Sequence, residues 1–134
     1  MKLTVLSENI AGSKFLAEHG LSYLIECNGE RIMFDTGSSD VFIKNAELLG
    51  IDIEKDIEKI VLSHGHWDHG DGLRFLANKT LITHPGSFKK RFGKSSQTFI
   101  GLALSREEII SKFNLVESKK PFEISKNIKR DLWG

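Results

Sequence analysis

The sequence predicts an α/β fold built on a mixed sheet, and three observations support this. Strand-like and helix-like segments alternate along the chain, which indicates layers of helix and sheet. Asn28-Gly29 is a strong hairpin signal near the start, so at least one strand pair is antiparallel. The chain has 134 residues, of which 40% are hydrophobic and 28% charged, as expected for one globular domain over residues 1–134.

The first third of the chain predicts three strands and two connections. Residues 2–7 alternate in polarity and indicate a strand, whereas residues 8–20 show little periodicity and indicate a loop. Residues 21–27 and 31–34 are apolar segments on either side of Asn28-Gly29. We therefore expect them to pair as a hairpin.

A helix is predicted next, over residues 40–49, and then a strand over residues 57–62. Ser38 or Ser39 is the expected N-cap of the helix, and Gly50 suits its C-terminal turn. The residues expected to form its buried face are Val41, Phe42, Asn45, Leu48 and Leu49.

The second half of the chain predicts shorter elements. Residues 73–77 indicate a short helix and residues 80–83 a strand. A capping-box pattern opens a helix over residues 105–113. Residues 114–117 and 122–124 indicate two final strands.

The charge and cysteine content excludes several classes of protein. Nineteen basic residues against eighteen acidic ones give a net charge of +1, so there is no charge excess to attract nucleic acid or a membrane surface. No apolar run approaches the roughly 20 residues that a transmembrane helix needs. The single cysteine, Cys27, excludes an internal disulfide and fits a cytoplasmic location.

The chemistry-bearing residues are concentrated in residues 63–72, after the strand predicted over residues 57–62. His64, His66, Asp68 and His69 form an H-x-H-x-D-H pattern. A chain of this composition contains that pattern by chance in about 4 of 10,000 cases. The pattern therefore indicates a site.

The spacing of the pattern suits metal binding. In an extended backbone, residues i and i+2 point the same way, so His64 and His66 can hold one ion across Gly65. Asp68 and His69 can face a second position. Imidazole and carboxylate ligands suit zinc, iron or manganese, and the ligand set alone does not choose among them. The competing readings are a surface turn that binds nothing and a closed structural zinc site, which four adjacent ligands would have difficulty forming.

The pattern resembles the signature of the metallo-β-lactamase-fold hydrolase superfamily. The strand end Phe34–Gly37 and the strand Ile60–Ser63 agree with that resemblance. Glu18–Ser22, Thr83–Pro85 and Gly101–Ser105 are similar to a branch named for dihydropterin-methyl ribofuranosyl-aminobenzene phosphate synthase. The resemblance implies the N-terminal half of an αββα sandwich, with a mixed sheet and helices on one face.

The resemblance also implies roles for individual residues. His64 and His66 would hold a first metal, zinc being expected, and Asp68 and His69 a second, with Asp68 also taking part in catalysis. Asp35 would orient a metal-site histidine; its alternative is a turn residue that bonds its own backbone. The remaining two histidines, His19 and His84, would line the substrate pocket, or would be loop histidines without that role.

The chain departs from the superfamily in length. The family's remaining ligands come later in its sequence, whereas this chain has no histidine after His84. We therefore expect a truncated domain. The leading hypothesis is a metal-dependent hydrolase of a small molecule, incomplete on its own. The alternatives are a non-catalytic metal-binding remnant and a subunit that completes its site with another chain.

A half sandwich would leave one apolar sheet face uncovered. Such a face usually finds a partner. We therefore expect a homodimer or a complex with a complementary chain.

Overall fold

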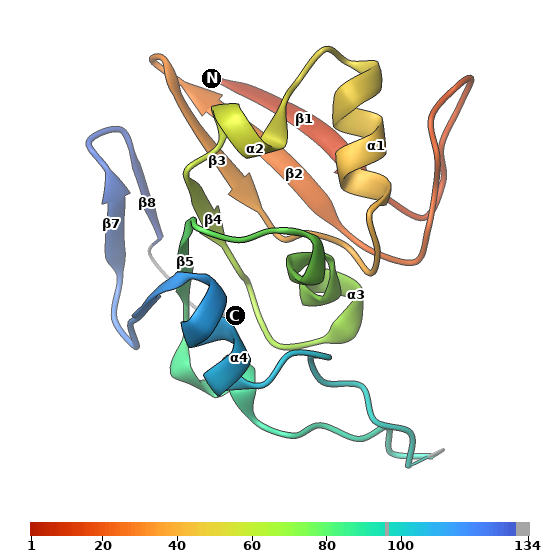
Figure 1. Ribbon diagram of the computed structural model, residues 1–134, viewed down its shortest axis with the longest axis vertical. Helices are drawn as coiled ribbons and strands as arrows, with labels where there is room; N and C mark the ends of the chain where they lie inside the picture. The colour runs from red at the N-terminus through yellow and green to blue at the C-terminus, as the bar shows by residue number, and fades with distance from the viewer. Residues whose placement is uncertain (96, 131–134) are drawn as a thin grey trace.

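The computed structural model describes residues 1–95 and 97–130, and its central feature is a mixed sheet (Figure 1). The first three strands pair antiparallel, and the third to sixth run parallel. The strands follow chain order: β1 (Lys2–Ser7), β2 (Ser22–Cys27), β3 (Glu30–Phe34), β4 (Lys59–Val61), β5 (Thr80–Thr83) and β6 (Asn114–Glu117). The predicted α/β class with a mixed sheet is confirmed.

The hairpin between β2 and β3 turns at Asn28-Gly29, as predicted. Both residues have positive φ, 49° at Asn28 and 81° at Gly29. A two-residue turn of this kind matches the right-handed twist of the strands that it joins.

The helices lie on one face of the sheet and cover the main hydrophobic core (Figure 1). They are α1 (Val41–Leu48), α2 (Ile53–Asp56), α3 (Trp67–Gly70) and α4 (Arg106–Lys112), with 3₁₀ turns η1 (Asp71–Phe75) and η2 (Pro85–Phe88). Phe42 of α1 and Ile109 of α4 are both fully buried there, against Leu24 and Leu81 of the sheet. Within the described part of the chain, no helix is long and apolar enough to cross a membrane.

The predicted cap of α1 was wrong. The N-cap residue is Asp40, whose side chain makes no capping hydrogen bond. The hydroxyl of Ser39 donates instead to the carboxylate of Glu18, which also accepts from the backbone N–H of Ser38 at 3.0 Å. The serines therefore hold the loop over residues 8–21 against the turn before α1.

The predicted helix over residues 73–77 was also wrong, since the helical segment starts earlier, at Trp67, and continues as η1 to Phe75. Its sequence contains poor helix formers, and contacts distant in sequence hold it. The N–H of Leu21 donates to the carbonyl of Asp68 at 3.1 Å, and that of Thr36 to the carbonyl of His69 at 2.8 Å. Local propensity alone could not locate this helix.

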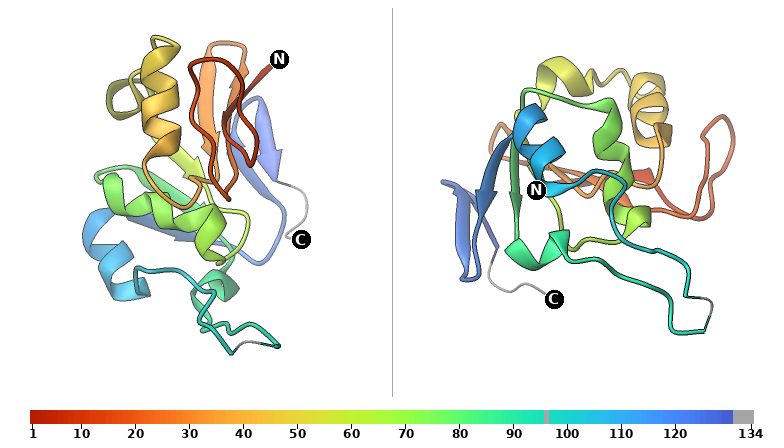
Figure 2. Two further views of the ribbon diagram at one scale, coloured as in Figure 1. Left: turned by 90° about the vertical axis from the view of Figure 1, so that its right-hand side faces the viewer. Right: turned by 60° about the horizontal axis from the view of Figure 1, so that its bottom comes forward.

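The opposite face of the sheet is partly covered by a C-terminal hairpin. It consists of β7 (Phe122–Ser125) and β8 (Ile128–Arg130), and lies across the sheet from α4 (Figure 2). Ile124 packs on Ile32, Val61 and Ile82, each no more than 2% exposed. The expectation of a bare face is therefore wrong for these central strands.

The outer face remains open at the edge strand. Leu3 and Val5 of β1 are 55% and 52% exposed. The prediction of a homodimer or of a complex with a complementary chain therefore depends on this smaller apolar surface.

Candidate metal site

The candidate site lies where β3 and β4 end side by side. These two strands are parallel neighbours, so the loops that follow them leave the same edge of the sheet. Asp35 comes directly after β3, and Ser63 to His66 follow β4. The chain then enters α3, which carries Asp68 and His69. The fold therefore brings together Asp35 and the four residues of the H-x-H-x-D-H pattern.

Asp35 is the buried centre of this arrangement. Its side chain is fully buried, and its carboxylate accepts three hydrogen bonds. One oxygen accepts from the backbone N–H of Ser63 at 2.7 Å. The other accepts from the Ser63 hydroxyl at 2.6 Å and faces Nδ1 of His69 at 2.7 Å. One carboxylate thus connects β3, the loop after β4, and α3.

These contacts fix which nitrogen of each ring carries the proton. The carboxylate can only accept, so Nδ1 of His69 donates to it, and Nε2 keeps its lone pair. The Ser63 hydroxyl gives its single proton to Asp35 and therefore accepts from Nδ1 of His64, 2.8 Å away. His64 and His69 are both left with Nε2 able to bind a metal.

The positions of the first two histidines fit one metal ion. Nε2 of His64 and Nδ1 of His66 are 3.1 Å apart. Two nitrogens bound to one tetrahedral zinc at their usual bond lengths lie about 3.3 Å apart. The rings are almost perpendicular, at 82°, and the two nitrogens face each other at hydrogen-bond distance.

Asp68 and His69 form a second pair beside the first. An oxygen of Asp68 lies 3.6 Å from Nε2 of His69, and the His69 ring centre is 4.2 Å from that of His64. His19, predicted to line the substrate pocket, places its Nε2 3.3 Å from the same Asp68 oxygen and is 65% exposed. The loop over residues 8–21 thus brings His19 to the site.

The environment shifts the pKa values of His64 and His69 in opposite directions. Burial, followed by the nearby rings of His69 and His66, lowers the pKa of His64. Burial also acts to lower the pKa of His69, but the hydrogen bond to Asp35 and the charges of Asp35 and Asp68 outweigh it and raise the pKa.

Taken as a donor set, the site consists of two pairs. Among the described residues, no group of three or more histidine, cysteine or acidic side chains is arranged to hold a metal ion. A zinc ion has four ligands, so each pair supplies half of a coordination shell. The residues fit the metal as partial ligands, with positions left for water, substrate or other protein groups.

His84 lies beside a different part of the histidine loop from His19. It lines a hollow of about 230 Å³ together with Ser63 and His64. Its Nδ1 accepts from the N–H of Gly86 at 2.9 Å and so caps η2. The structure therefore places both histidines that were expected in the pocket at the edges of the candidate metal site.

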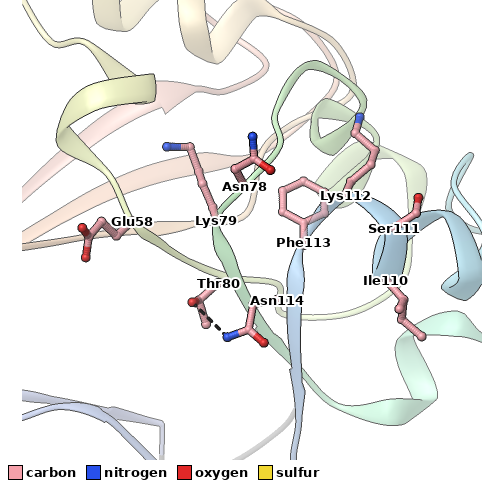
Figure 3. Close-up of a pocket in the computed structure, with 9 residues that line it drawn as sticks. All are labelled: Glu58, Asn78, Lys79, Thr80, Ile110, Ser111, Lys112, Phe113 and Asn114. Atoms are coloured by element: carbon pink, nitrogen blue, oxygen red, sulfur yellow. Dashed lines mark hydrogen bonds between the residues drawn. The ribbon is translucent and has the colours of Figure 1, made fainter.

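A separate hollow lies at the far end of the parallel strands, shown in Figure 3. It measures about 510 Å³ and is lined by residues that include Lys79, Thr80 and Asn114. Thr80 and Asn114 begin β5 and β6, whereas the histidines follow the end of β4. This hollow is therefore remote from the candidate site.

Ser63 is the site residue whose role the sequence analysis missed. The sequence identifies Ser63 only as the residue at the end of a predicted strand. No local pattern distinguishes a serine that links two site residues from a serine that merely packs in the interior. Only its bonds to Asp35, 28 positions earlier, and to His64 reveal the role.

Comparison with known proteins relates the chain to larger ones. It is 36% identical over 133 residues to an uncharacterized protein of Methanocaldococcus jannaschii, covering 94% of this chain and 50% of the relative. It is also 36% identical over 118 residues to a protein of that organism named 7,8-dihydropterin-6-methyl-4-(beta-D-ribofuranosyl)-aminobenzene-5'-phosphate synthase, covering 79% of this chain and 40% of the relative. The chain thus spans half or less of the length of the curated relatives it matches.

Solved structures show the same relation. A metal-dependent hydrolase of the beta-lactamase superfamily superposes with a TM-score of 0.82 at 31% identity, covering 95% of this chain and 46% of the other. A quorum-quenching N-acyl homoserine lactone lactonase superposes with a TM-score of 0.58 over 81% of this chain and 48% of the other. At 18% identity, that second likeness shows the fold alone.

The sequence profile of one family covers the site itself. It matches residues 17–86, which include His19, Asp35, the H-x-H-x-D-H pattern and His84. The mixed sheet with helices on one face corresponds to half of that family's fold. The chain therefore belongs to the metallo-beta-lactamase superfamily.

Proposed function

We propose that the protein is a metal-dependent hydrolase acting on a small molecule, with zinc as the expected metal and iron or manganese as alternatives. One observation carries the proposal: the buried carboxylate of Asp35 holds His69 directly, and His64 through the Ser63 hydroxyl, so that Nε2 of each ring can bind a metal. A purely structural cluster has no need of that proton arrangement. Membership of a superfamily whose solved members include a metal-dependent hydrolase supports the same reading.

Each residue has a distinct task in this proposal. His64 and His66 would hold one metal, and Asp68 and His69 a second. Such metals, when bound, supply Lewis acidity that polarises a carbonyl or phosphoryl group and acidifies water. Asp35 keeps the imidazoles oriented. Asp68, 20% exposed, accepts a proton from the attacking water or holds that water in position.

A second candidate function is that of a metal-binding subunit. The chain spans half or less of the length of the curated relatives it matches, and its described residues supply two ligands to each metal. The missing ligands would then come from a second copy or from a complementary chain. A non-catalytic metal-binding protein is the limiting case of this candidate.

Substrate and location are also proposals. One relative at 36% identity is named as a synthase of a small organic molecule, so a compact organic substrate is the favoured class over nucleic acid or membrane. The single cysteine favours a cytoplasmic location.

Metal content tests the first step of the proposal. The full chain, purified without a histidine tag, should retain zinc, iron or manganese. His64→Ala/His66→Ala should lose most of it, whereas His84→Ala, outside the proposed ligand set, should keep it. Equal metal content in the double variant and the parent chain would overturn the assignment.

Hydrolysis separates the two candidate functions. With half of each coordination shell supplied, we expect weak turnover of phosphomonoesters, phosphodiesters and lactones by the chain alone. Strong turnover that Asp68→Ala abolishes would show that the chain completes its own site. Turnover that arises only on adding a second chain would favour the subunit candidate.

A further inference from the structure

The basic residues of this chain are unevenly distributed. Residues 72–106 contain seven lysines and arginines and no aspartate or glutamate. The rest of the chain has twelve basic residues against eighteen acidic ones. The chain therefore contains a basic segment although its net charge is near zero. This segment begins at η1 and ends at the start of α4.

Part of this segment borders the metal-ligand cluster. The hollow of about 230 Å³ between the histidine loop and η2 includes two cationic side chains in its lining. The lining residues are Ser63, His64, His84, Gly86, Ser87, Lys89 and Arg91. No carboxylate is among them, and the fully buried Asp35 is held by its own three hydrogen bonds.

The wall of this hollow is tightly built. A Cβ placed on Gly65 would lie 1.7 Å from the carbonyl oxygen of Ser87, so η2 packs directly on the histidine loop. The Ser87 hydroxyl is 2.7 Å from that of Thr83, and both side chains are buried. The two loops that form the hollow are therefore held at a fixed separation.

Arg91 is anchored beside this wall. Its guanidinium donates to the carbonyl oxygens of Gly86 at 2.8 Å, Lys89 at 3.1 Å and Ser87 at 3.3 Å. These bonds go to neutral carbonyls, and within residues 1–95 and 97–130 no carboxylate contacts the Arg91 guanidinium. Lys89 itself is exposed to solvent at the rim.

We propose that this hollow binds a phosphate group carried by the small-molecule substrate. The proposal deepens the proposed function, because it assigns a substrate feature to the same site. Two cationic side chains without a carboxylate match a phosphate monoester, which carries a charge of about −1.5 to −2 at neutral pH. A carboxylate, with one charge, matches them less well. The hollow is smaller than a typical pocket for a whole ligand, as expected for a subsite that receives one group.

The position of the hollow fits this role. His64 lines it and also belongs to the first metal-ligand pair. A phosphate held there leaves the rest of a small substrate within reach of the two pairs. The basic residues thus select and position the substrate, while the bond that reacts lies at the metal-ligand cluster.

Phosphate binding by the metal-free chain tests the proposal. The full chain is treated with EDTA and titrated with inorganic phosphate and phenyl phosphate, with benzoate as the carboxylate comparison. Amide NMR shifts report where each ligand binds. We expect both phosphates to shift Gly86, Ser87 and Lys89, and benzoate to bind at least about fivefold more weakly.

Two neighbouring lysines provide a matched pair of variants. Lys89→Gln should weaken phosphate binding about fivefold or more, because a charged contact is lost. Lys90→Gln removes the same charge one residue away, outside the lining, and should change the affinity less than twofold. Equal effects of the two variants would overturn the proposal, since they would indicate a diffuse basic surface.

The remaining outcomes distinguish this proposal from the proposed function. Phosphate binding that persists in His64→Ala/His66→Ala supports the phosphate subsite even if that chain binds no metal. If phosphate binds only after zinc is added, and Lys89→Gln does not change its affinity, the anion binds to the metal. That result would overturn the proposed phosphate subsite. A short RNA that binds more tightly than phenyl phosphate and is weakened equally by Lys89→Gln, Lys90→Gln and Lys94→Gln would overturn it in favour of a nucleic-acid surface.

Discussion

Replacing Asp35 with asparagine should reverse the proton positions on two histidines at once. The Asp35 oxygen that accepts from the Ser63 N–H must remain an acceptor, because a backbone N–H can only donate. The new NH₂ group therefore takes the place of the other oxygen and donates toward Ser63 and His69. Nδ1 of His69 becomes an acceptor, and the freed Ser63 proton turns toward Nδ1 of His64. Each ring then carries its proton on Nε2.

The expected magnitudes follow from these contacts. A protonated Nε2 cannot bind a metal, and loss of an orienting partner of this kind costs about 10- to 100-fold in metal affinity. The bonds from Ser63 and His69 also lose their charged acceptor, which lowers the free energy of unfolding by about 1–3 kcal/mol. Backbone strain adds nothing, since Asp35 has a φ of 57° and asparagine tolerates that region.

The assay for Asp35→Asn has three readouts: zinc affinity by competition with a chelator, unfolding in urea, and the tautomers of His64 and His69 from ring ¹⁵N shifts. Ser22→Ala is the matched control. The Ser22 hydroxyl donates to the backbone carbonyl of Asp35 at 2.8 Å and does not touch the carboxylate. The control should lose stability and keep the tautomers. A folded Asp35→Asn chain with unchanged tautomers and unchanged zinc affinity would refute the reasoning.

Three further substitutions test the packing and charge of the fold, near the site and away from it. Gly65→Ala should lower the free energy of unfolding by about 2 kcal/mol or more and weaken zinc binding, because the new Cβ would lie 1.7 Å from the carbonyl oxygen of Ser87. The control Gly12→Ala, whose Cβ would have nothing within 4 Å, should leave thermal unfolding nearly unchanged. Lys79→Met should lower the free energy of unfolding, measured in urea, by about 1–3 kcal/mol. The buried ammonium donates to three backbone carbonyls around α2, and the variant leaves them without this donor. Burial raises the pKa of Asp71, so ionising this carboxyl group destabilises the folded state. This destabilisation is absent below about pH 4, where the group is protonated in the folded and the unfolded chain. Asp71→Asn should therefore stabilise the fold at pH 7 and have no effect at pH 3; stabilisation at both values would contradict this.

Local patterns in the sequence carried most of what could be predicted of the fold. The hairpin at Asn28-Gly29 and the capping box that opens α4 depend on residues within four positions of each other, and both are present. The Gly50 turn after α1 has the expected positive φ of 76°. Such features depend on backbone preferences that each residue carries with it.

Features that depend on distant partners could not be predicted in the same way. The α3 helix is held by Leu21 and Thr36, which lie more than 30 positions earlier than their partners. The short α2 was not predicted, and neither was β8. The strand predicted at residues 122–124 is present, but its position on the outer face depends on Ile124 meeting strands from three other parts of the chain. Sequence periodicity identifies an apolar face without identifying what covers it.

The candidate site follows the same division. The H-x-H-x-D-H pattern predicted the four ligand-type residues, because their spacing is local, and the fold brings them together with Asp35. The proton arrangement that favours metal binding comes from Asp35 and Ser63, 28 positions apart and joined across adjacent strand ends. Every bond that fixes this arrangement lies within residues 35–69. The tautomers of His64 and His69 are thus set within this segment, although Leu21 and Ser87, outside it, also hold the backbone of the site in place. Whatever completes the coordination shells, whether more of a longer chain, a second copy or a separate partner, meets ligands that are already oriented. Under the proposed function its contribution is then ligands and enclosure of the substrate, and a metal-affinity measurement on this chain alone reports how strongly the H-x-H-x-D-H residues bind a metal by themselves.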